Sequence, residues 1–534
     1  MTTVREATID LCRARRLTLW FGNPGSSELT LLQDFPDDFR YILGLQEAIP
    51  VGMADGWVQI TGRPALVCLH TAPGMGNGQG ALYNAYVNKT PLIVIAGNQR
   101  RMMQNQFTLL TNIDAINEPR PYVKWSAEPA IASEVPAVLD HAITLATAPP
   151  TGPVFVSIPM DDCEFELEDT QVADIQRVRD RKVGFSGGFS DEIAQDIATR
   201  LDAAEKPVLI VGGDVERYGA RDDVVALAER ANATVWTAPL TGLSGFPENH
   251  SLYQGLLPAA KGPLSDKLTG HDFVLVIGAP VFRYYPYVAG RYLPDGARLV
   301  HITNDPDEAG RAPVGDAEVG DIRVATRTVL ARITRTDRPA PQAREAVPSV
   351  QQAATPLDPA NLWNVVGQNA PADTLWVSES GSNEMIIPEV VRPSGPKSHL
   401  SAAGGGLGWG LPAAVGAQLA APDRPVVALM GDGSMHYSIT ALWTAAQQRI
   451  PLTIVVASNA EYGVLKQFGA LEKTAGVPGL DVPGLDITAT AASYGVSAHQ
   501  AGSTDEVAEL VREGIADRAN PTLINVPVTK VPLP

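Results

Sequence analysis

Two apolar runs that each end in small and polar residues constrain this chain most. Residues 426–430 lead into Gly431-Asp432-Gly433-Ser434, and residues 452–457 lead into Ser458-Asn459-Ala460-Glu461. A strand that passes into a helix at such a motif directs main-chain N–H groups and the positive helix end toward an anion. The Asp432 carboxylate and the Asn459 amide oxygen could hold a divalent cation, and a bare carbonyl, assigned here to Glu461, could complete its oxygen shell. The two runs therefore predict a metal-bound diphosphate at the carboxyl ends of adjacent parallel strands.

Gly431-Asp432-Gly433 followed by Asn459 resembles the diphosphate-binding signature of thiamine diphosphate enzymes. Members of this family also need a carboxylate that hydrogen-bonds the pyrimidine ring of the cofactor. Glu47 fits that role, because it follows the apolar run 41–45 and precedes residues 48–56, which are similar to the family's helix. The resemblance further implies that the Gly405 carbonyl accepts the cofactor's exocyclic amine and that Leu407 props its two rings into a bent shape. The implied cofactor-binding residues are Glu47, Gly405, Leu407, Gly431, Asp432, Gly433, Ser434 and Asn459, with Mg²⁺ or Ca²⁺ at Asp432, Asn459 and Glu461.

Within that family the chain is most similar to the benzoylformate decarboxylases. The resemblance is carried by residues 21–26, 45–48, 69–70, 110–112, 278–284 and 437–447. It implies non-oxidative decarboxylation of an aromatic 2-oxo acid to an aldehyde and carbon dioxide through a thiamine-bound enamine.

The same resemblance implies the substrate contacts. Ser26 would bind the substrate carboxylate, and His70, at the end of the predicted strand 65–69, would orient it and shuttle protons. Leu110, Leu465 and Phe468 correspond to apolar pocket walls, which would favour an aromatic ring by burying more apolar surface.

The chain departs from the family pattern at three positions. Tyr285 stands where the family has a second active-site histidine, Val464 where an alanine is expected, and Gly381 where a threonine is expected. A phenol titrates near pH 10, so Tyr285 can donate a hydrogen bond but is a poorer proton relay at neutral pH. A carboligase or lyase acting on 2-hydroxy ketones is therefore the alternative function. A non-enzymatic cofactor-binding protein is disfavoured because Glu47, Asp432 and Asn459 are all retained.

Short runs rich in Val, Ile and Leu at residues 65–69, 92–96 and 154–158 alternate with helix-length amphipathic segments. This alternation predicts an α/β fold of doubly wound parallel sheets, and 534 residues predict about three domains. We expect a pyrimidine-binding domain at 1–168, a middle domain at 190–334 and a diphosphate-binding domain at 358–534, the first and third being copies of one architecture. The charged stretch 163–191 and the proline-rich stretch 334–359 are predicted linkers. Gly212-Gly213 lacks the spacing of a dinucleotide site, so no second cofactor is assigned.

The net charge of −18 disfavours nucleic acid or an anionic membrane as a partner. The apolar runs are too short to cross a bilayer and residues 1–6 lack a signal-peptide core, so we expect a cytoplasmic protein. Cys12, Cys68 and Cys163 have no metal-type spacing and are expected to be reduced packing residues. The family resemblance implies a homodimer at least, and a homotetramer as the expected assembly, with the 2-oxo acid as the small-molecule partner.

Overall fold

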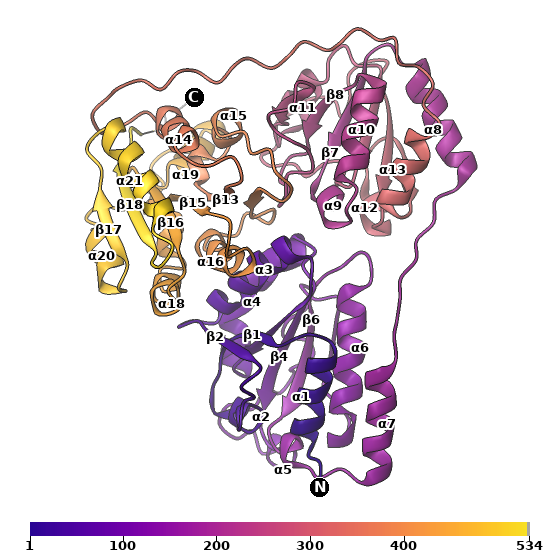
Figure 1. The fold of residues 1–534 in the computed structure, drawn as a ribbon, viewed down its shortest axis with the longest axis vertical. Coiled ribbons are helices and arrows are strands. Elements are labelled where there is room, and N and C mark those ends of the chain that lie inside the picture. Colours follow the sequence, from indigo (N-terminus) through magenta and orange to yellow (C-terminus); the bar gives the residue numbers. More distant parts are fainter. Residues whose placement is uncertain (531–534) are drawn as a thin grey trace.

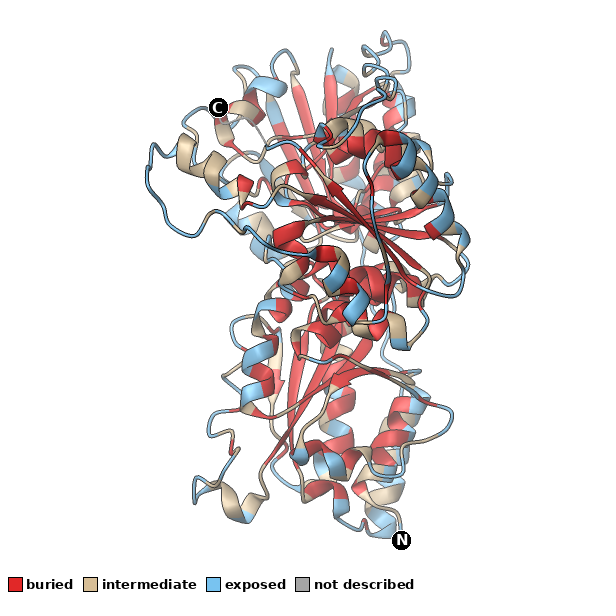
Figure 2. Cartoon of the chain, turned by 90° about the vertical axis from the view of Figure 1, so that its left-hand side faces the viewer, coloured by how far each residue is buried: buried red, intermediate tan, exposed pale blue. Residues whose placement is uncertain are grey.

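Three parallel sheets of six strands each follow one another along the computed structural model, which describes residues 1–530 (Figure 1). Their strands are nearly continuous runs of buried apolar residues, because helices cover both faces of each sheet (Figure 2). The predicted class of three doubly wound α/β domains is confirmed. The exact domain boundaries stay a prediction.

The first sheet has the strand order β2-β1-β3-β4-β6-β5. Its strands are β1 Leu19–Asn23, β2 Arg40–Leu43, β3 Ala65–Leu69, β4 Leu92–Asn98, β5 Trp125–Ala127 and β6 Val154–Pro159. The accompanying helices are α1 Val4–Ala14, η1 Ser26–Glu28, α2 Leu29–Leu32, α3 Ala48–Thr61, α4 Ala72–Val87, α5 Arg101–Gln104, η2 Ala132–Glu134, α6 Val135–Thr147, η3 Asp162–Glu164 and α7 Asp169–Asp180.

The middle sheet has the order β12-β11-β10-β7-β8-β9, so the chain winds outward from β7 in both directions. Its strands are β7 Pro207–Val211, β8 Thr234–Thr237, β9 Tyr253–Leu256, β10 Phe273–Ile277, β11 Arg298–Thr303 and β12 Asp316–Val319. Its helices are α8 Asp191–Ala203, α9 Gly213–Arg217, α10 Arg221–Ala231, α11 Lys261–Lys267, α12 Pro306–Arg311 and α13 Ile322–Leu330.

The third sheet has the order β14-β13-β15-β16-β18-β17, which repeats the winding of the first sheet strand for strand. Its strands are β13 Leu375–Glu379, β14 His399–Ser401, β15 Val426–Gly431, β16 Leu452–Ser458, β17 Ser497–Gln500 and β18 Thr522–Pro527. Its helices are α14 Pro359–Gln368, η4 Gly381–Asn383, α15 Ile387–Val390, α16 Gly410–Ala420, α17 Asp432–His436, α18 Ala441–Gln447, α19 Gly463–Leu471, α20 Ile487–Ser493 and α21 Thr504–Ala516. The expectation that the first and third domains copy one architecture is confirmed.

One predicted linker is partly wrong, because helix α7 occupies most of the first half of the stretch 163–191. The Gln171 side chain accepts the N–H of Glu168 at the start of this helix, and Val172 and Ile175 pack onto the core beside α1 and α6. In the sequence these two apolar residues, one helical turn apart, lie among polar and charged neighbours and do not by themselves predict a helix. The second predicted linker contains no helix until α14 begins at Pro359, and it crosses the top of the molecule between α13 and α14 (Figure 1).

Helices α3 and α16 join the first and third domains within the chain. Their backbones approach closely, since a side chain at Gly56 would collide with the Ala413 carbonyl and one at Gly416 with the Met53 carbonyl. The Trp409 indole N–H also donates to the buried Asp55 carboxylate at 2.7 Å. The two domains therefore share one hydrophobic core.

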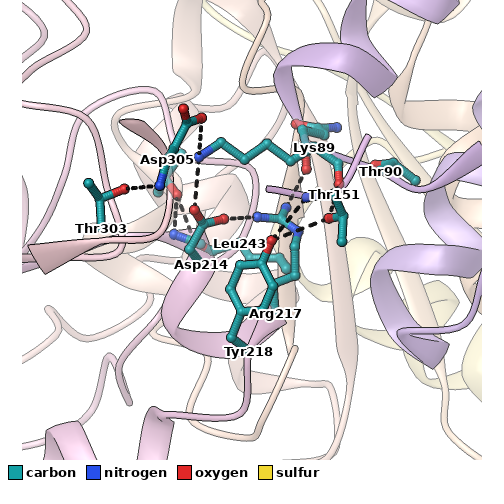
Figure 3. Close-up of polar contacts among 12 residues, drawn as sticks. Lys89, Thr90, Thr151, Asp214, Arg217, Tyr218, Leu243, Thr303 and Asp305 are labelled. Atoms are coloured by element: carbon teal, nitrogen blue, oxygen red, sulfur yellow. Dashed lines mark hydrogen bonds and ion pairs between the residues drawn. The ribbon is translucent and has the colours of Figure 1, made fainter. Parts of the chain in front are cut away.

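Lys89 joins the first domain to the middle domain (Figure 3). Its Nζ lies 2.9 Å from Asp214, which follows β7, and 3.1 Å from Asp305 and 2.9 Å from Glu308, which both follow β11. Burial lowers the pKa of Lys89, but the three carboxylates outweigh it and the net pKa is raised. This ion cluster lies where the middle sheet changes winding direction, between β7 and β10, which is where an open α/β sheet usually binds ligands. None of the described helices combines the length and apolar character that a membrane crossing requires.

Candidate active site

Most of the predicted site residues lie at the carboxyl ends of the first and third sheets, whereas Tyr285 follows β10 of the middle sheet. In the third sheet, the chain changes winding direction between β13 and β15, where β15 ends at Gly431 and Asp432 begins α17. In the first sheet, the same change falls between β1 and β3, where Ser26 and His70 follow the strands. Such switch points open crevices for ligands. The first and third domains thus each provide a candidate ligand-binding position at the same place in their sheets.

Asp432 is buried and organises the end of the third sheet. Its Oδ1 accepts the N–H of Gly433 at 2.8 Å, while Oδ2 accepts those of Asn459 at 3.0 Å and Ala460 at 2.8 Å. The Asn459 amide oxygen in turn accepts the N–H of Glu461 at 3.1 Å. The structure therefore brings Asp432 and Asn459 together, with one carboxylate tying β15 to the turn after β16.

Glu461 turns its carboxylate away from this turn. Its Oε2 pairs with Lys466 and lies 3.2 Å from Lys530 Nζ. Only a main-chain oxygen of Glu461 is thus suited to the predicted metal shell. Among the described residues no group of three or more His, Cys, Asp and Glu side chains could hold a metal. The predicted shell is of a different kind, since it uses one carboxylate with amide and main-chain oxygens.

The surroundings of Asp432 fit a bound diphosphate. Four buried polar atoms in the segments after β13 and β15 lack a partner among the described residues: Ser380 Oγ, Asn383 Oδ1, His436 Nε2 and Ser438 Oγ. Buried polar atoms are costly unless they are paired, so such a group implies a polar ligand or water. A Cβ at Gly433 would lie 2.6 Å from the Tyr462 ring, and one at Gly431 would lie 3.6 Å from the buried Ser434 Oγ. Gly433 therefore allows a close approach that a side chain would block, whereas Gly431 has room for one.

Gly405 and Leu407 lie in a loop before α16. Gly405 has φ +69°, a left-handed conformation that favours glycine, and open space surrounds the position of its absent Cβ. The Leu407 side chain is 38% exposed although it is large and apolar. Both residues thus face outward from the third domain.

Glu47 lies at the N-terminal end of α3, after β2 ends at Leu43 rather than at the predicted residue 45. Its side chain is buried, and Oε2 accepts a hydrogen bond from Asn77 Nδ2 at 3.1 Å. Within residues 1–530 no hydrogen bond or ion pair links Glu47 to Asp432. The two predicted cofactor anchors thus belong to separate parts of the chain.

His70 follows β3 and contacts Glu28, which sequence reasoning missed. Its Nδ1 lies 3.0 Å from Glu28 Oε2 and 3.2 Å from Ser27 Oγ. Because a carboxylate can only accept, Nδ1 carries the proton in this pair and Nε2 is the free nitrogen. The hydrogen bond to Glu28 raises the pKa of His70 against the opposing effect of burial. Ser26, the predicted carboxylate binder, is exposed at the start of η1, beside this pair.

Glu28 is buried and has four donors around its two oxygens. It accepts the N–H of Gly25 at 2.7 Å and of Gly97 at 2.6 Å, besides the Ser27 hydroxyl and His70. In the sequence a glutamate three residues after a glycine turn indicates only a helix-start charge. The Gly25-x-x-Glu28 spacing was the available signal, since it is a helix-capping pattern.

Tyr285 meets Phe468 across the border between the middle and third domains. Their ring centroids lie 4.9 Å apart at 70°, an edge-to-face arrangement, and Tyr285 is 60% exposed. Leu465 lies one turn before Phe468 on α19 and is also partly exposed. Leu110 belongs to the first domain and adopts φ +65°, a strained conformation for a bulky residue that is typical of functional loops. The predicted apolar walls therefore come from two domains.

Three family models match the chain in order. The N-terminal TPP binding domain of thiamine pyrophosphate enzymes matches residues 2–117, the central domain residues 194–330, and the C-terminal TPP binding domain residues 379–526. The chain is a thiamine pyrophosphate enzyme. The predicted family is confirmed.

Three relatives of this thiamine pyrophosphate enzyme show that it resembles the benzoylformate decarboxylases within the family. A benzoylformate decarboxylase from Pseudomonas aeruginosa is 44% identical over 532 residues, which cover 99% of this chain and 100% of the relative. A solved 4-hydroxybenzoylformate decarboxylase of Rhodococcus jostii RHA1 is 43% identical with a TM-score of 0.96, covering 99% of this chain and 100% of that one. A solved benzoylformate decarboxylase from Polynucleobacter necessarius is 42% identical with a TM-score of 0.95 over both full chains. The predicted resemblance to benzoylformate decarboxylases is therefore confirmed.

Proposed function

We propose that this thiamine pyrophosphate enzyme decarboxylates an aromatic 2-oxo acid to an aldehyde and carbon dioxide. The observation that carries the proposal is the 44% identity to a benzoylformate decarboxylase over 99% of the chain. The retained Glu47, Asp432 and Asn459, in the surroundings described above, support it.

Thiamine diphosphate supplies the electron sink that breaking the bond to carbon dioxide requires. Asp432, Asn459 and the main chain of Glu461 would hold Mg²⁺ or Ca²⁺ against its diphosphate, with Gly431, Gly433 and Ser434 beside it. Glu47 would hydrogen-bond its pyrimidine ring. Leu407 would pack against its rings, and the Gly405 carbonyl would accept a hydrogen bond from its exocyclic amine.

The chain's own polar groups would handle the substrate. Ser26 would donate to the substrate carboxylate, and His70 would present Nε2 for proton transfer while Glu28 holds Nδ1. Leu110, Leu465 and Phe468 would enclose the aromatic ring. Because the protein is acidic overall, these local donors must attract the anionic substrate.

We further propose that a working site needs two chains, as a homodimer or homotetramer. Glu47 and Asp432 lie in different domains with no contact between them in one chain. Four exposed apolar side chains also cluster in the segment that carries Leu110: Met102, Phe107, Leu109 and Ile113. Apolar residues grouped in this way are typical of protein interfaces. A cytoplasmic location stays a prediction from the sequence.

A carboligase or lyase acting on 2-hydroxy ketones is the second candidate, and Tyr285 favours it. A phenol at the border of the pocket transfers protons less readily near neutral pH than an imidazole does, which gives carbon–carbon bond formation more time.

A substrate panel tests the two candidates. The purified protein is supplied with thiamine diphosphate and Mg²⁺ and then with benzoylformate, 4-hydroxybenzoylformate, a branched aliphatic 2-oxo acid or pyruvate. We expect stoichiometric aldehyde and carbon dioxide from the aromatic acids, with kcat/KM at least tenfold above that for pyruvate. Benzoin-type product without net aldehyde would establish the carboligase instead.

A further inference from the structure

The loop of residues 403–409, called here the glycine loop, carries the two outward-facing residues Gly405 and Leu407. Glycine loses more conformational freedom on ordering than any other residue, so a loop with four glycines needs contacts that fix it. Three buried side chains supply contacts that fix the glycine loop.

Asn84 of helix α4 holds the middle of the glycine loop. Its Nδ2 donates to the Gly406 carbonyl at 2.8 Å, and its Oδ1 accepts the Gly406 N–H at 3.1 Å. The Asn84 side chain is 1% exposed. One amide from the first domain thus pairs with both main-chain groups of the residue between Gly405 and Leu407.

The two ends of the glycine loop are held by other buried side chains. Asn88 Oδ1 accepts the Ala403 N–H at 3.2 Å, and Glu379 Oε1 accepts the Gly408 N–H at 2.6 Å. Only the Asn84 contact acts at the loop's centre among these three. The Gly405 N–H also donates to the Ala402 carbonyl at 3.1 Å within the chain's own turn. Asn84 is therefore the side chain best placed to set the direction of the Gly405 carbonyl and the Leu407 side chain.

The glycines show which side of the loop faces the protein. A Cβ at Gly404 would lie 2.8 Å from Asn84 Oδ1, and one at Gly406 would lie 2.9 Å from its Nδ2. A Cβ at Gly408 would lie 2.9 Å from Tyr437 Cβ, whereas one at Gly405 would meet nothing within 4 Å. Gly404 and Gly406 thus permit the close approach of Asn84 and Gly408 that of Tyr437, whereas Gly405 faces open space.

Helix α4 carries a second asparagine, Asn77, that hydrogen-bonds a proposed cofactor-binding residue. Asn77 lies seven residues before Asn84, so the two side chains share one face about 10 Å apart. Asn77 donates to Glu47, the proposed pyrimidine contact. One helix therefore bears both the support of Glu47 and the support of the glycine loop.

We infer that Asn84 is a positioning residue of the proposed reaction, which fixes the Gly405 carbonyl and Leu407 toward thiamine diphosphate through Gly406. The inference rests on the proposed function. Asn84 itself would touch neither substrate nor cofactor.

The pair of hydrogen bonds between the Asn84 side chain and Gly406 is called here the clasp. Asn84→Asp tests it with almost no change in side-chain shape. The variant replaces the donor Nδ2 with an oxygen, which cannot donate to the Gly406 carbonyl when it is ionised. The matched control is Asn364→Asp. Asn364 is also buried, donates to the Pro348 carbonyl at 2.7 Å and lies on α14 away from the loop. Hydrogen exchange of the peptide covering residues 403–409 in the cofactor-free protein should quicken in Asn84→Asp and stay unchanged in Asn364→Asp.

A second measurement follows the exchange of the thiazolium C2 proton of bound thiamine diphosphate in deuterium oxide. We expect Asn84→Asp to slow this exchange about 100-fold at saturating cofactor, since small misplacements of reacting groups cost about that much. Exchange at the wild-type rate would overturn the inference. Both measurements need no substrate, so they remain decisive if the protein does not decarboxylate aromatic 2-oxo acids.

Gly404→Ala provides a variant that leaves Asn84 in place. Its Cβ would lie 2.8 Å from Asn84 Oδ1, closer than to any other atom, and 3.0 Å from the Tyr83 ring. It should therefore reproduce both effects if the clasp matters. If Asn84→Asp fails to fold, Gly404→Ala decides alone, and normal loop and C2 exchange in that variant would refute the role of Asn84.

Discussion

The imidazole Nδ1 of His70 lies 3.0 Å from the buried carboxylate of Glu28. The same carboxylate accepts two main-chain N–H groups, so its position is fixed by β1 and β4 together. His70 is therefore held with its protonated Nδ1 inward and its Nε2 free. This relationship makes the charge state of His70 depend on Glu28.

Glu28→Gln should lower the pKa of His70 toward its ordinary value near 6.5, because the hydrogen bond that raises it is lost. In the wild type this pair stabilises the fold most below pH 6.5, and the contribution is lost as pH rises through the raised pKa of His70. The variant should shift the corresponding limb of the pH profile of kcat/KM to lower pH and reduce kcat/KM about tenfold or more. NMR titration of the His70 ring protons measures the shift directly.

Glu192→Gln, which changes an exposed residue, is the control for Glu28→Gln. In this control the His70 ring should titrate as it does in the wild type. An unchanged His70 pKa in Glu28→Gln would mean that another group sets it.

Asp432→Asn should weaken the binding of thiamine diphosphate with Mg²⁺ about 100-fold or more, because it removes the only carboxylate of the predicted metal shell. Calorimetric titration measures this affinity, and chelation of Mg²⁺ from the wild type should cause a similar loss. Asp486→Asn, which alters the exposed cap of α20, should bind as the wild type does. Full affinity in Asp432→Asn would place the metal elsewhere.

Tyr285→His should raise the rate of aldehyde release about tenfold at pH 7, because an imidazole titrates near this pH and a phenol does not. The ratio of aldehyde to benzoin-type product should rise with it. Tyr285→Phe keeps the ring that packs on Phe468 but lacks the hydroxyl, so it separates packing from proton transfer. Equal product ratios in all three proteins would remove Tyr285 from the chemistry.

Glu379→Gln should flatten the pH dependence of stability. Burial raises the pKa of Glu379 to about 8, against the hydrogen bonds from the Gly408 and Gly410 N–H groups. The wild type should therefore lose stability relative to the variant as pH rises from about 5 toward 8, because the buried carboxyl must then ionise. Thermal unfolding across this pH range measures the difference. A wild type that gains stability with pH relative to Glu379→Gln would contradict the expectation.

The predicted strands agree closely with the structure where an apolar run ends at a polar turn. Residues 65–69 coincide with β3, and Asp432 and Asn459 lie in adjacent turns as expected. Periodicity and turn chemistry are local signals, so the sequence contains them. Glu28 and Asn84 were missed because their roles depend on Gly97 and Gly406, which lie far away along the chain.

The unpredicted helix α7 has the same kind of cause. Its polar composition resembles a linker, and its two apolar residues gain meaning only once α1 and α6 are beside them. Sequence reasoning therefore found the ends of strands and missed tertiary partners.

The Lys89 cluster bears on how chimeras of such enzymes can be built. The ammonium comes from the first domain and its three carboxylates from the middle domain, so neither half is electrically balanced when separated. A buried charge without its counterion costs several kcal/mol. Exchanging the middle domain with that of a homologue should thus succeed only when acceptors for this lysine travel with it, which makes the junction a constraint on modular recombination.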